Sequence, residues 1–287
     1  MKVQLQFRAL NAHELILHEI AVRQKHYEAE DLDVELVDGT QPGVHQQQAR
    51  FSVGIGGSLI QRLQTGTPWT AVLVATDYPL FWLVGRHGFA EPTALRGKRL
   101  AVHPPHAAPA MFSRIVLSQH SLDLDRDCQL VVVQDRLRDD AEKLGLLQSG
   151  EVDAAIVGSR VAPSVYERLG FELLLTFGDS FRFSTTGLAV NTALVALDDP
   201  LVSALARATR RALADLHEQP EAATEALERI LLESSQEDAL RFRALLTRTF
   251  SRDGRPARER CMTGLARLAQ ALGINRAPAF EDVYRTR

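Results

Sequence analysis

The stretch Phe51-Ser-Val-Gly-Ile-Gly-Gly-Ser58 decides the fold, because an apolar strand pattern runs into closely spaced glycines and then into a helical pattern. Glycine lets the backbone turn sharply and lets other groups approach it closely. Three further phrases extend the pattern along the chain: Tyr27-Glu-Ala-Glu-Asp-Leu-Asp-Val-Glu-Leu-Val37, Leu95-Arg-Gly-Lys-Arg-Leu-Ala-Val102 and Leu147-Gln-Ser-Gly-Glu-Val-Asp-Ala-Ala-Ile-Val157. Strands that alternate with helices predict an α/β protein with mainly parallel sheets.

The same alternation covers most of the chain up to a helical tail. Strand patterns lie at Val3–Phe7, Val34–Val37, Phe51–Ile55, Thr70–Ala75, Leu80–Val84, Arg99–Val102, Gln129–Val133, Ala154–Val157 and Gly187–Val190. Helical patterns lie at His13–Tyr27, Pro42–Arg50, Ser58–Gln64, Pro109–His120, Asp139–Ser149 and Val161–Leu169, with Asn11 as a candidate cap of the first. The tail is rich in helix formers and is predicted to be helical at Pro200–Gln219, Pro220–Glu233, Gln236–Thr249 and Arg255–Leu272.

Composition excludes several function classes. The chain has 287 residues, of which 45% are hydrophobic and 24% charged, which suits a globular protein with two cores. A formal net charge of -3 gives no basic stripe for nucleic acid. The longest apolar runs are of strand length, so no membrane insertion is expected. Cys128 and Cys261 lie far apart without a CxxC motif, and we expect both thiols to be unpaired.

Taken together and in this order, the four phrases resemble the type 2 periplasmic-binding-protein superfamily, in its taurine, alkanesulfonate, nitrate and thiamine-pyrimidine-precursor branch. The resemblance implies a two-lobed α/β fold with two crossover strands, Leu80–Val84 and Gly187–Val190, and a helical C-terminal tail packed on the first lobe. It implies that residues 1–84 begin lobe 1, that residues 85–187 form lobe 2, and that residues 188–287 return to lobe 1.

The function that the resemblance implies is that of a substrate-binding protein. Such a protein would clamp a small anionic organic solute, such as a sulfonate, a carboxylate or a heterocyclic precursor, between its lobes for ABC-type uptake. The implied partners are the small-molecule ligand and an ABC permease. The opening Met1-Lys-Val-Gln-Leu-Gln-Phe-Arg8 reads as a strand without a signal-peptide pattern. The chain as it stands is therefore expected to be cytoplasmic, or periplasmic if a leader has been removed.

The fold predicts where the ligand binds, because open parallel sheets bind ligands beyond the carboxyl ends of their strands. Helix N-termini there offer backbone N–H groups to an anion. The candidate ligand-binding residues in these loops are Asn11, His13, Gly39, Thr40, Gly56, Gly57, Ser58, Asp77, Tyr78, His103, His106, Ser159, Arg160, Arg182, Ser184 and Thr185.

The glycine segment carries the most weight among these candidates. In related receptors the corresponding stretch brings backbone amides and a hydroxyl to the ligand, and Gly56, Gly57 and Ser58 match that pattern. The alternative is a tight strand-to-helix turn with Ser58 as its N-cap. The spacing departs from the dinucleotide fingerprint at the third glycine, which excludes a nicotinamide, and no cofactor is predicted.

Histidines and arginines supply the other candidate contacts. The motif His103-Pro-Pro-His106 follows a second-lobe strand, and its imidazoles suit ligand contact, a capped surface loop, or metal or acid–base chemistry. No third metal ligand is evident nearby, so no metal is predicted. Arg160 and Arg182 match an oxyanion, or else form solvated or inter-lobe pairs.

Four aromatic residues and two pairs of aspartates also allow more than one interpretation. Phe81, Trp82, Phe181 and Phe183 suit either a core or a wall for the ligand, and the core is the commoner outcome. The pairs Asp139-Asp140 and Asp198-Asp199 suit helix starts, where a carboxylate complements the dipole, and are assigned no chemistry.

An enzyme on the same scaffold is the alternative function. The superfamily includes aryl-sulfinate desulfinases, thiamine-pyrimidine synthases and menaquinone-pathway lyases. Desulfinase-like members use a cysteine in an early loop, but Leu10–Glu14 has none, and the cysteine cluster of the pyrimidine synthases is also missing. If the protein is an enzyme, His13, His103 and His106 are the candidate acids or bases.

Overall fold

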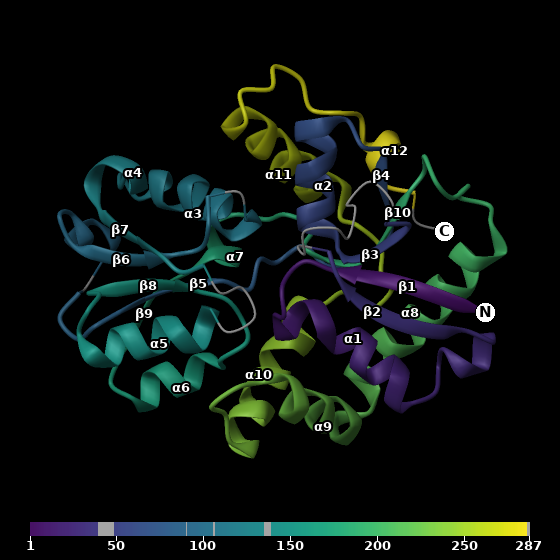
Figure 1. The fold of residues 1–287 in the computed structure, drawn as a ribbon, viewed down its shortest axis with the longest axis horizontal. Coiled ribbons are helices and arrows are strands. Elements are labelled where there is room, and N and C mark those ends of the chain that lie inside the picture. The colour runs from purple at the N-terminus through teal and green to yellow at the C-terminus, as the bar shows by residue number, and fades with distance from the viewer. Residues whose placement is uncertain (40–48, 90, 106, 135–138, 286–287) are drawn as a thin grey trace.

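Two five-stranded sheets lie side by side in the computed structural model, one in each lobe (Figure 1). The structure describes residues 1–39, 49–89, 91–105, 107–134 and 139–285. The first sheet has the strand order β2-β1-β3-β10-β4, and the second has the order β7-β6-β8-β5-β9. The two-lobed α/β fold expected from the sequence is thereby confirmed.

The first sheet is mostly parallel. Its strands are β1 (Lys2–Phe7), β2 (Asp33–Asp38), β3 (Phe51–Gly54), β4 (Trp69–Thr76) and β10 (Thr186–Asn191). Strand β1 pairs in parallel with β2 and β3, whereas β10 runs antiparallel to β3 and β4. Every residue of β4 is buried, as expected for a strand that is covered on both faces.

The second sheet follows the same plan. Its strands are β5 (Trp82–Gly85), β6 (Arg99–Val102), β7 (Gln129–Val132), β8 (Ala154–Val157) and β9 (Glu172–Thr176). Strand β6 pairs in parallel with β7 and β8, whereas β5 runs antiparallel to β8 and β9. Strand β9 was not predicted from the sequence, because its run Glu-Leu-Leu-Leu-Thr lacks the alternation of polar and apolar residues that marks a half-buried strand.

The chain crosses between the sheets twice, through residues 77–81 and residues 177–185. Strands β5 and β10 are the first strands after each crossing, and they coincide with the two predicted crossover strands. Both run against their neighbours because each enters its sheet from the other lobe. The lobe boundaries drawn from the sequence stay a prediction.

Helices cover both faces of each sheet (Figure 1). In the first lobe α1 and α2 lie on opposite sides of the sheet, and in the second lobe α3 and α4 lie opposite α5 and α6 (Figure 1). The helices of this part are α1 (Ala12–Arg23), α2 (Ile55–Thr65), α3 (Ala108–Gln119), α4 (Leu124–Asp127), α5 (Asp139–Ser149), α6 (Pro163–Arg168) and α7 (Phe177–Ser180), with short 3-10 turns at Glu28–Glu30 and Pro92–Leu95.

The C-terminal tail is helical, as predicted, but it touches both lobes. Its helices are α8 (Pro200–Glu218), α9 (Pro220–Ile230), α10 (Gln236–Thr249), α11 (Arg258–Ala271) and α12 (Phe280–Val283). Helices α8 and α9 pack on α1 of the first lobe, while α10 contacts α6 and α11 contacts α3 of the second lobe. Asp238 on α10 accepts hydrogen bonds from Arg168 Nη1 at 2.8 Å and 2.9 Å.

Helix boundaries show where local chemistry overrides periodicity. The predicted bounds of α5 and α10 match the structure, but the first helix ends at Arg23 instead of Tyr27, where Lys25 has a left-handed φ of 57°. Helix α11 starts three residues late, at Arg258, because Pro256 disfavours helical backbone at the residue before it. The helix predicted for Pro42–Arg50 falls largely outside the described residues. Within the described chain, no helix is both long and apolar enough to span a membrane.

Candidate functional site

A cavity of about 300 Å³ lies in the crevice between the lobes. Its first-lobe wall comes from the loop after β1, the start of α1 and helix α2, and its second-lobe wall comes from the loop after β6, the start of α3 and the start of α5. Six of the residues predicted to bind ligand line it: Asn11, His13, Gly56, Gly57, His103 and Thr185. The cavity therefore lies where the fold rule placed the site, beyond the strand ends.

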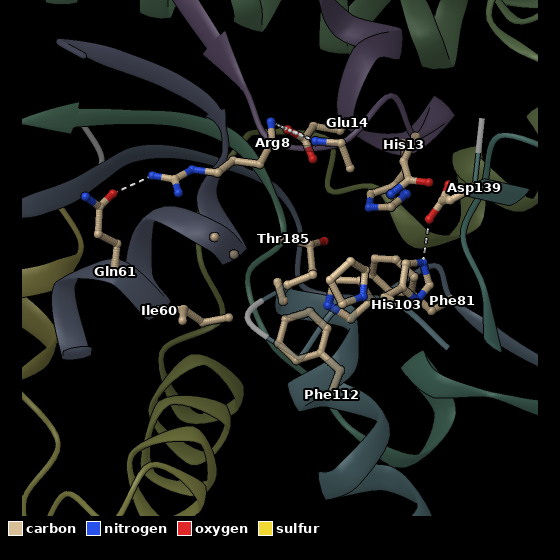
Figure 2. Close-up of a pocket in the computed structure, with 18 of the residues that line it drawn as sticks. Arg8, His13, Glu14, Ile60, Gln61, Phe81, His103, Phe112, Asp139 and Thr185 are labelled. Carbon is tan, nitrogen blue, oxygen red and sulfur yellow. Dashed lines mark hydrogen bonds and ion pairs between the residues drawn. The ribbon is translucent and has the colours of Figure 1, made fainter. Parts of the chain in front are cut away.

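One end of the cavity is polar and centres on Arg8. Its side chain extends from the loop after β1 toward α2, where Nη2 donates to Gln61 Oε1 (Figure 2). The backbone N–H groups of Arg8 and Ala9 donate to Glu14 Oε1, at 2.5 Å and 3.4 Å. The first turn of α1 therefore reaches back and fixes the loop that carries the guanidinium.

Glu14 is buried beside this arginine. Burial raises the pKa of its carboxyl to about 7, although the two backbone N–H groups and the charge of Arg8 act in the opposite direction. The buried carboxyl of Glu14 leaves room only for glycine at position 54, because a Cβ on Gly54 would lie 2.5 Å from Glu14 Oε1. The polar end thus combines a permanent cation with a carboxyl that titrates near neutral pH.

Hydrogen bonds join the two lobes at the rim of the cavity. Asn11 stands at the N-cap position of α1 but makes no side-chain cap. Its Oδ1 instead accepts from the Ser159 N–H of the second lobe, at 3.0 Å. The predicted capping role of Asn11 is therefore wrong, because the side chain is used across the crevice.

Ser159 completes this inter-lobe contact through His13. The His13 N–H donates to Ser159 Oγ at 3.1 Å, and Oγ lies 2.6 Å from His13 Nδ1. Burial lowers the pKa of His13 to about 3, so the imidazole is neutral. With Oγ accepting from the N–H, we assign its hydroxyl proton to Nδ1, which leaves the ring proton on Nε2 as a donor.

His103 is held by a carboxylate on the opposite wall. Its Nε2 lies 3.0 Å from Asp139 Oδ2, and the same oxygen accepts from Lys143 Nζ at 3.1 Å (Figure 2). Burial opposes ionisation of Asp139, but Lys143 and His103 outweigh it and hold the pKa of that carboxyl below its usual range. Asp139 was assigned no chemistry from the sequence, yet it lines the cavity and orients His103.

His103, Asp139 and Asp140 lie close enough together to be examined as metal ligands, with donor atoms within 4.8 Å of one another. The buried ammonium of Lys143 already neutralises Asp139, and Asp140 accepts from the N–H groups of Gly158 and Arg160 at 2.7 Å and 2.9 Å. These partners satisfy both carboxylates without a metal ion, so the three residues fit a structural network better than a metal centre.

The other end of the cavity is apolar. Phe81 from the first crossover and Phe112 from α3 line it, with ring centroids 6.0 Å apart. The edge of Phe81 also meets His13, at 5.4 Å between centroids. Of the aromatic residues weighed from the sequence, only Phe81 is both buried and part of this wall; Trp82, Phe181 and Phe183 belong to the core.

Two predicted cations do not line the cavity. Arg160 Nη1 donates to the Leu10 carbonyl across the crevice at 3.1 Å. Arg182 Nη1 pairs with Asp77 Oδ1 at 3.6 Å, and its guanidinium lies 4.4 Å from the centre of the Tyr78 ring. Arg182 therefore forms an ion pair, as the alternative reading expected, whereas Arg160 forms an inter-lobe hydrogen bond to a backbone carbonyl; ligand contact by either arginine stays a prediction.

Three other predicted residues, Ser58, Ser184 and Gly39, make local or core contacts. Ser58 is not the N-cap of α2, since that position is Gly54, and its Oγ donates to the Gly54 carbonyl within the helix. Ser184 lies in the core, 3.1 Å from Tyr284 Oη. Gly39 donates its N–H to the Phe7 carbonyl beside β1. Thr40 and His106 lie outside the described residues.

Several lining residues were missed by the sequence analysis. Arg8, Glu14, Gln61, Gln64 and Phe112 line the cavity but were not among the candidates. Arg8 follows β1 directly, at the carboxyl end of a parallel strand, and this position was a usable signal. Gln61 lies four residues after Gly57, and Gln64 lies three residues after Gln61, which puts all three on one face of α2.

Comparisons with known proteins agree with this architecture. The chain resembles the aliphatic sulphonate binding protein SsuA from Escherichia coli (13% identity, TM-score 0.69, covering 95% of this chain and 90% of that one). It also resembles the zinc-bound ligand-binding component of an ABC-type import system from Staphylococcus aureus (11% identity, TM-score 0.72, covering 100% of this chain and 97% of that one). A third similar structure is that of a variant of the desulfurization enzyme DSZB in complex with biphenyl-2-sulfinic acid (15% identity, TM-score 0.71, covering 100% of this chain and 96% of that one).

At these identities, structural likeness shows a shared fold and leaves function to the site. No curated protein matches the sequence. The model of the family described as NMT1/THI5 like matches residues 18–223, which is most of the chain. The protein therefore belongs to the NMT1/THI5-like family.

Proposed function

We propose that this protein is a substrate-binding protein that closes its two lobes around a small organic solute. The observation that carries the proposal is a cavity with walls from both lobes, bordered by two hydrogen bonds across the crevice: the Ser159 N–H donates to Asn11 Oδ1, and the His13 N–H donates to Ser159 Oγ. A solute between such walls gains contacts only when the lobes are closed. It therefore shifts the population toward the closed state, which a membrane partner can read.

The two ends of the cavity define the class of solute. Arg8 and Gln61 present donors to an oxyanion, and a guanidinium suits a sulfonate or carboxylate. Phe81 and Phe112 suit an apolar or aromatic body. We propose a small organic acid or an acidic heterocycle, with its anionic group toward Arg8 and its ring or chain toward Phe112.

Glu14 adds a condition on this solute. At pH values below about 7 its carboxyl is protonated and donates, while above that pH its charge partly cancels that of Arg8. The cavity therefore holds a monoanion better than a dianion. A protonated ring nitrogen or amine on the same solute would gain from ionised Glu14.

An enzyme on this scaffold is the second candidate, and one observation favours it. His103 is oriented by Asp139, the arrangement of a general base held by a carboxylate. The chain's two cysteines do not line the cavity, however, so thiol chemistry of the kind expected for a desulfinase finds no nucleophile there. The binding function requires no such group and fits the site better.

A receptor of this kind requires a membrane partner, for which we propose an ABC permease. The S. aureus structure named above is the ligand-binding component of an ABC-type import system, and the E. coli structure is an aliphatic sulphonate binding protein. Both likenesses support this proposal. The compartment in which the two would meet stays a prediction from the sequence.

Native mass spectrometry of gently purified protein tests the proposed function. A thermal-shift screen of sulfonates, carboxylates and pyrimidines accompanies it. Each solute is recovered after hours of incubation, and its molecular mass is measured. The proposal predicts one solute per chain, a raised melting temperature and an unchanged solute mass. A product of altered mass that is lost in His103→Ala would establish the enzyme instead.

A further inference from the structure

A second cavity, of about 260 Å³, lies against the segments that join the two lobes. It shares no lining residue with the crevice cavity. Asp77 comes from the first crossover and Arg182 from the second, while the tail contributes Arg248 at the end of α10, Arg255, and Arg260 in α11. Both crossovers and the tail therefore meet around one space.

The charges around this second cavity are not balanced. Four arginines face one aspartate, a formal excess of three positive charges. Asp77 Oδ2 lies 2.7 Å from Arg260 Nε, and Asp77 Oδ1 lies 3.6 Å from Arg182 Nη1, so one carboxylate serves two guanidinium groups.

The other two arginines have little or no compensation. Arg255 Nε is 4.0 Å from Asp253 Oδ2, and both side chains are largely exposed, so that pair contributes little. Arg248 has no ion pair among the described residues. Clustered cations of this kind repel one another, and an oxyanion between them relieves the repulsion.

The wall that carries these arginines is fixed by backbone hydrogen bonds. The Ser251 N–H donates to the Ala75 carbonyl at 2.7 Å, and the Val74 N–H donates to the Gly254 carbonyl at 2.8 Å. The loop between α10 and α11 is therefore held along β4. Ser251 Oγ donates to the Val74 carbonyl, so contacts to an anion would come chiefly from guanidinium groups.

We propose that this second cavity binds a polyvalent oxyanion of the phosphate or sulfate class. The space is several times the roughly 30 Å³ that one water occupies in the liquid, so a tetrahedral dianion fits within it. Guanidinium forks match such an anion bidentately. Bound there, the anion links Arg182 of the second crossover to Arg248 of the tail and stiffens the crossovers that join the two lobes. This proposal does not depend on what the crevice binds.

The test is a titration of the full chain with inorganic phosphate and with sulfate, against sodium chloride of equal ionic strength. Melting temperature and calorimetric heat are both followed. We expect a saturable rise in melting temperature beyond that in chloride, and affinity roughly tenfold or more weaker in Arg248→Gln. Arg241→Gln is the matched control, because Arg241 lies on the same helix and pairs with Glu237 at 2.6 Å outside the cavity.

One further variant and one check on folding complete the test. Arg8→Gln should retain phosphate binding, because Arg8 lines only the crevice cavity. Arg248 is exposed, so Arg248→Gln should fold normally, which the melting temperature without anion checks. Loss of binding in Arg8→Gln, equal affinity in Arg248→Gln and Arg241→Gln, or no saturable effect beyond chloride would each overturn the proposal.

Discussion

Ser159→Ala should weaken solute binding although the side chain of Ser159 lies outside the solute cavity. Ser159 does not line the cavity, but its Oγ accepts the His13 N–H at 3.1 Å and meets His13 Nδ1 at 2.6 Å. Removing Oγ leaves two polar groups of a buried histidine without that partner. A buried polar group that loses its partner costs about 1–3 kcal/mol.

The cost falls on the closed state, because water can hydrate His13 and residue 159 once the lobes separate. A solute that requires closure then binds more weakly by the same free energy. A loss of about 1–3 kcal/mol corresponds to a Kd about 5- to 150-fold higher. Calorimetric titration with the co-purified solute measures this change, and small-angle scattering should show a larger radius of gyration in the variant without solute.

Ser113→Ala is the matched control for this experiment. Ser113 is equally buried, but its Oγ donates to the Pro109 carbonyl inside α3, so no inter-lobe bond is lost. We expect its Kd to stay close to that of the wild type. If Ser159→Ala and Ser113→Ala bind the solute equally well, the inter-lobe bond does not stabilise closure and the reasoning fails.

Three other predictions test the site and the tail. Gly158→Ala should raise the Kd, because the new Cβ would lie 2.2 Å from Asn11 Oδ1 and force the lobes apart; unchanged affinity by calorimetry would contradict this. Burial raises the pKa of Glu14 from 4.5 to about 7, so its protonated form contributes stability that is full below pH 4.5 and lost as the pH rises through about 7. Urea unfolding from pH 4.5 to 7.5 should therefore show Glu14→Gln gaining up to about 3 kcal/mol relative to the wild type, and a constant difference would refute the shifted pKa. Phe242→Ala should cost about 3–5 kcal/mol, because this buried ring of α10 packs 6.2 Å from Trp82; a loss below about 1 kcal/mol in urea unfolding would show that the tail does not stabilise the second lobe.

The order of strands and helices could be read from the sequence because periodic segments are bounded by clear turn residues. The helix Asp139–Ser149 is followed directly by Gly150, and the strand Ala154–Val157 begins four residues after that glycine, so both elements were placed correctly. Strand β9 and the crossover helix α7 were missed, since neither has a periodicity that distinguishes it from a loop.

Some of the candidate residues named from the sequence line the crevice cavity, while their role in binding stays a prediction. Gly56 and Gly57 in the first turn of α2 and the loop after β6 both line the cavity, at the ends of strands as the general rule predicts. Arg182 does not line the crevice cavity but pairs with Asp77, a contact between the two crossovers that sequence spacing does not reveal. Arg8 reaches the cavity because β1 pairs with β3 and brings its loop beside α2.

Asn11 shows a similar limit. Its position just before a helical pattern is typical of an N-cap, and it does stand at that position. Its side chain forms the more distant bond to Ser159 because the two lobes meet there and bury both groups. Competition between a local cap and a tertiary partner is decided by packing, which a single sequence does not contain.

The central claim is that a solute is held between the lobes by Arg8 at one end and Phe112 at the other. A crystal structure of the protein with its co-purified solute tests this most directly. The account predicts an unmodified molecule in the crevice, with its anionic group within hydrogen-bond distance of the Arg8 guanidinium and its apolar part against Phe112. A solute bound outside the crevice, or contacting one lobe only, would contradict the account.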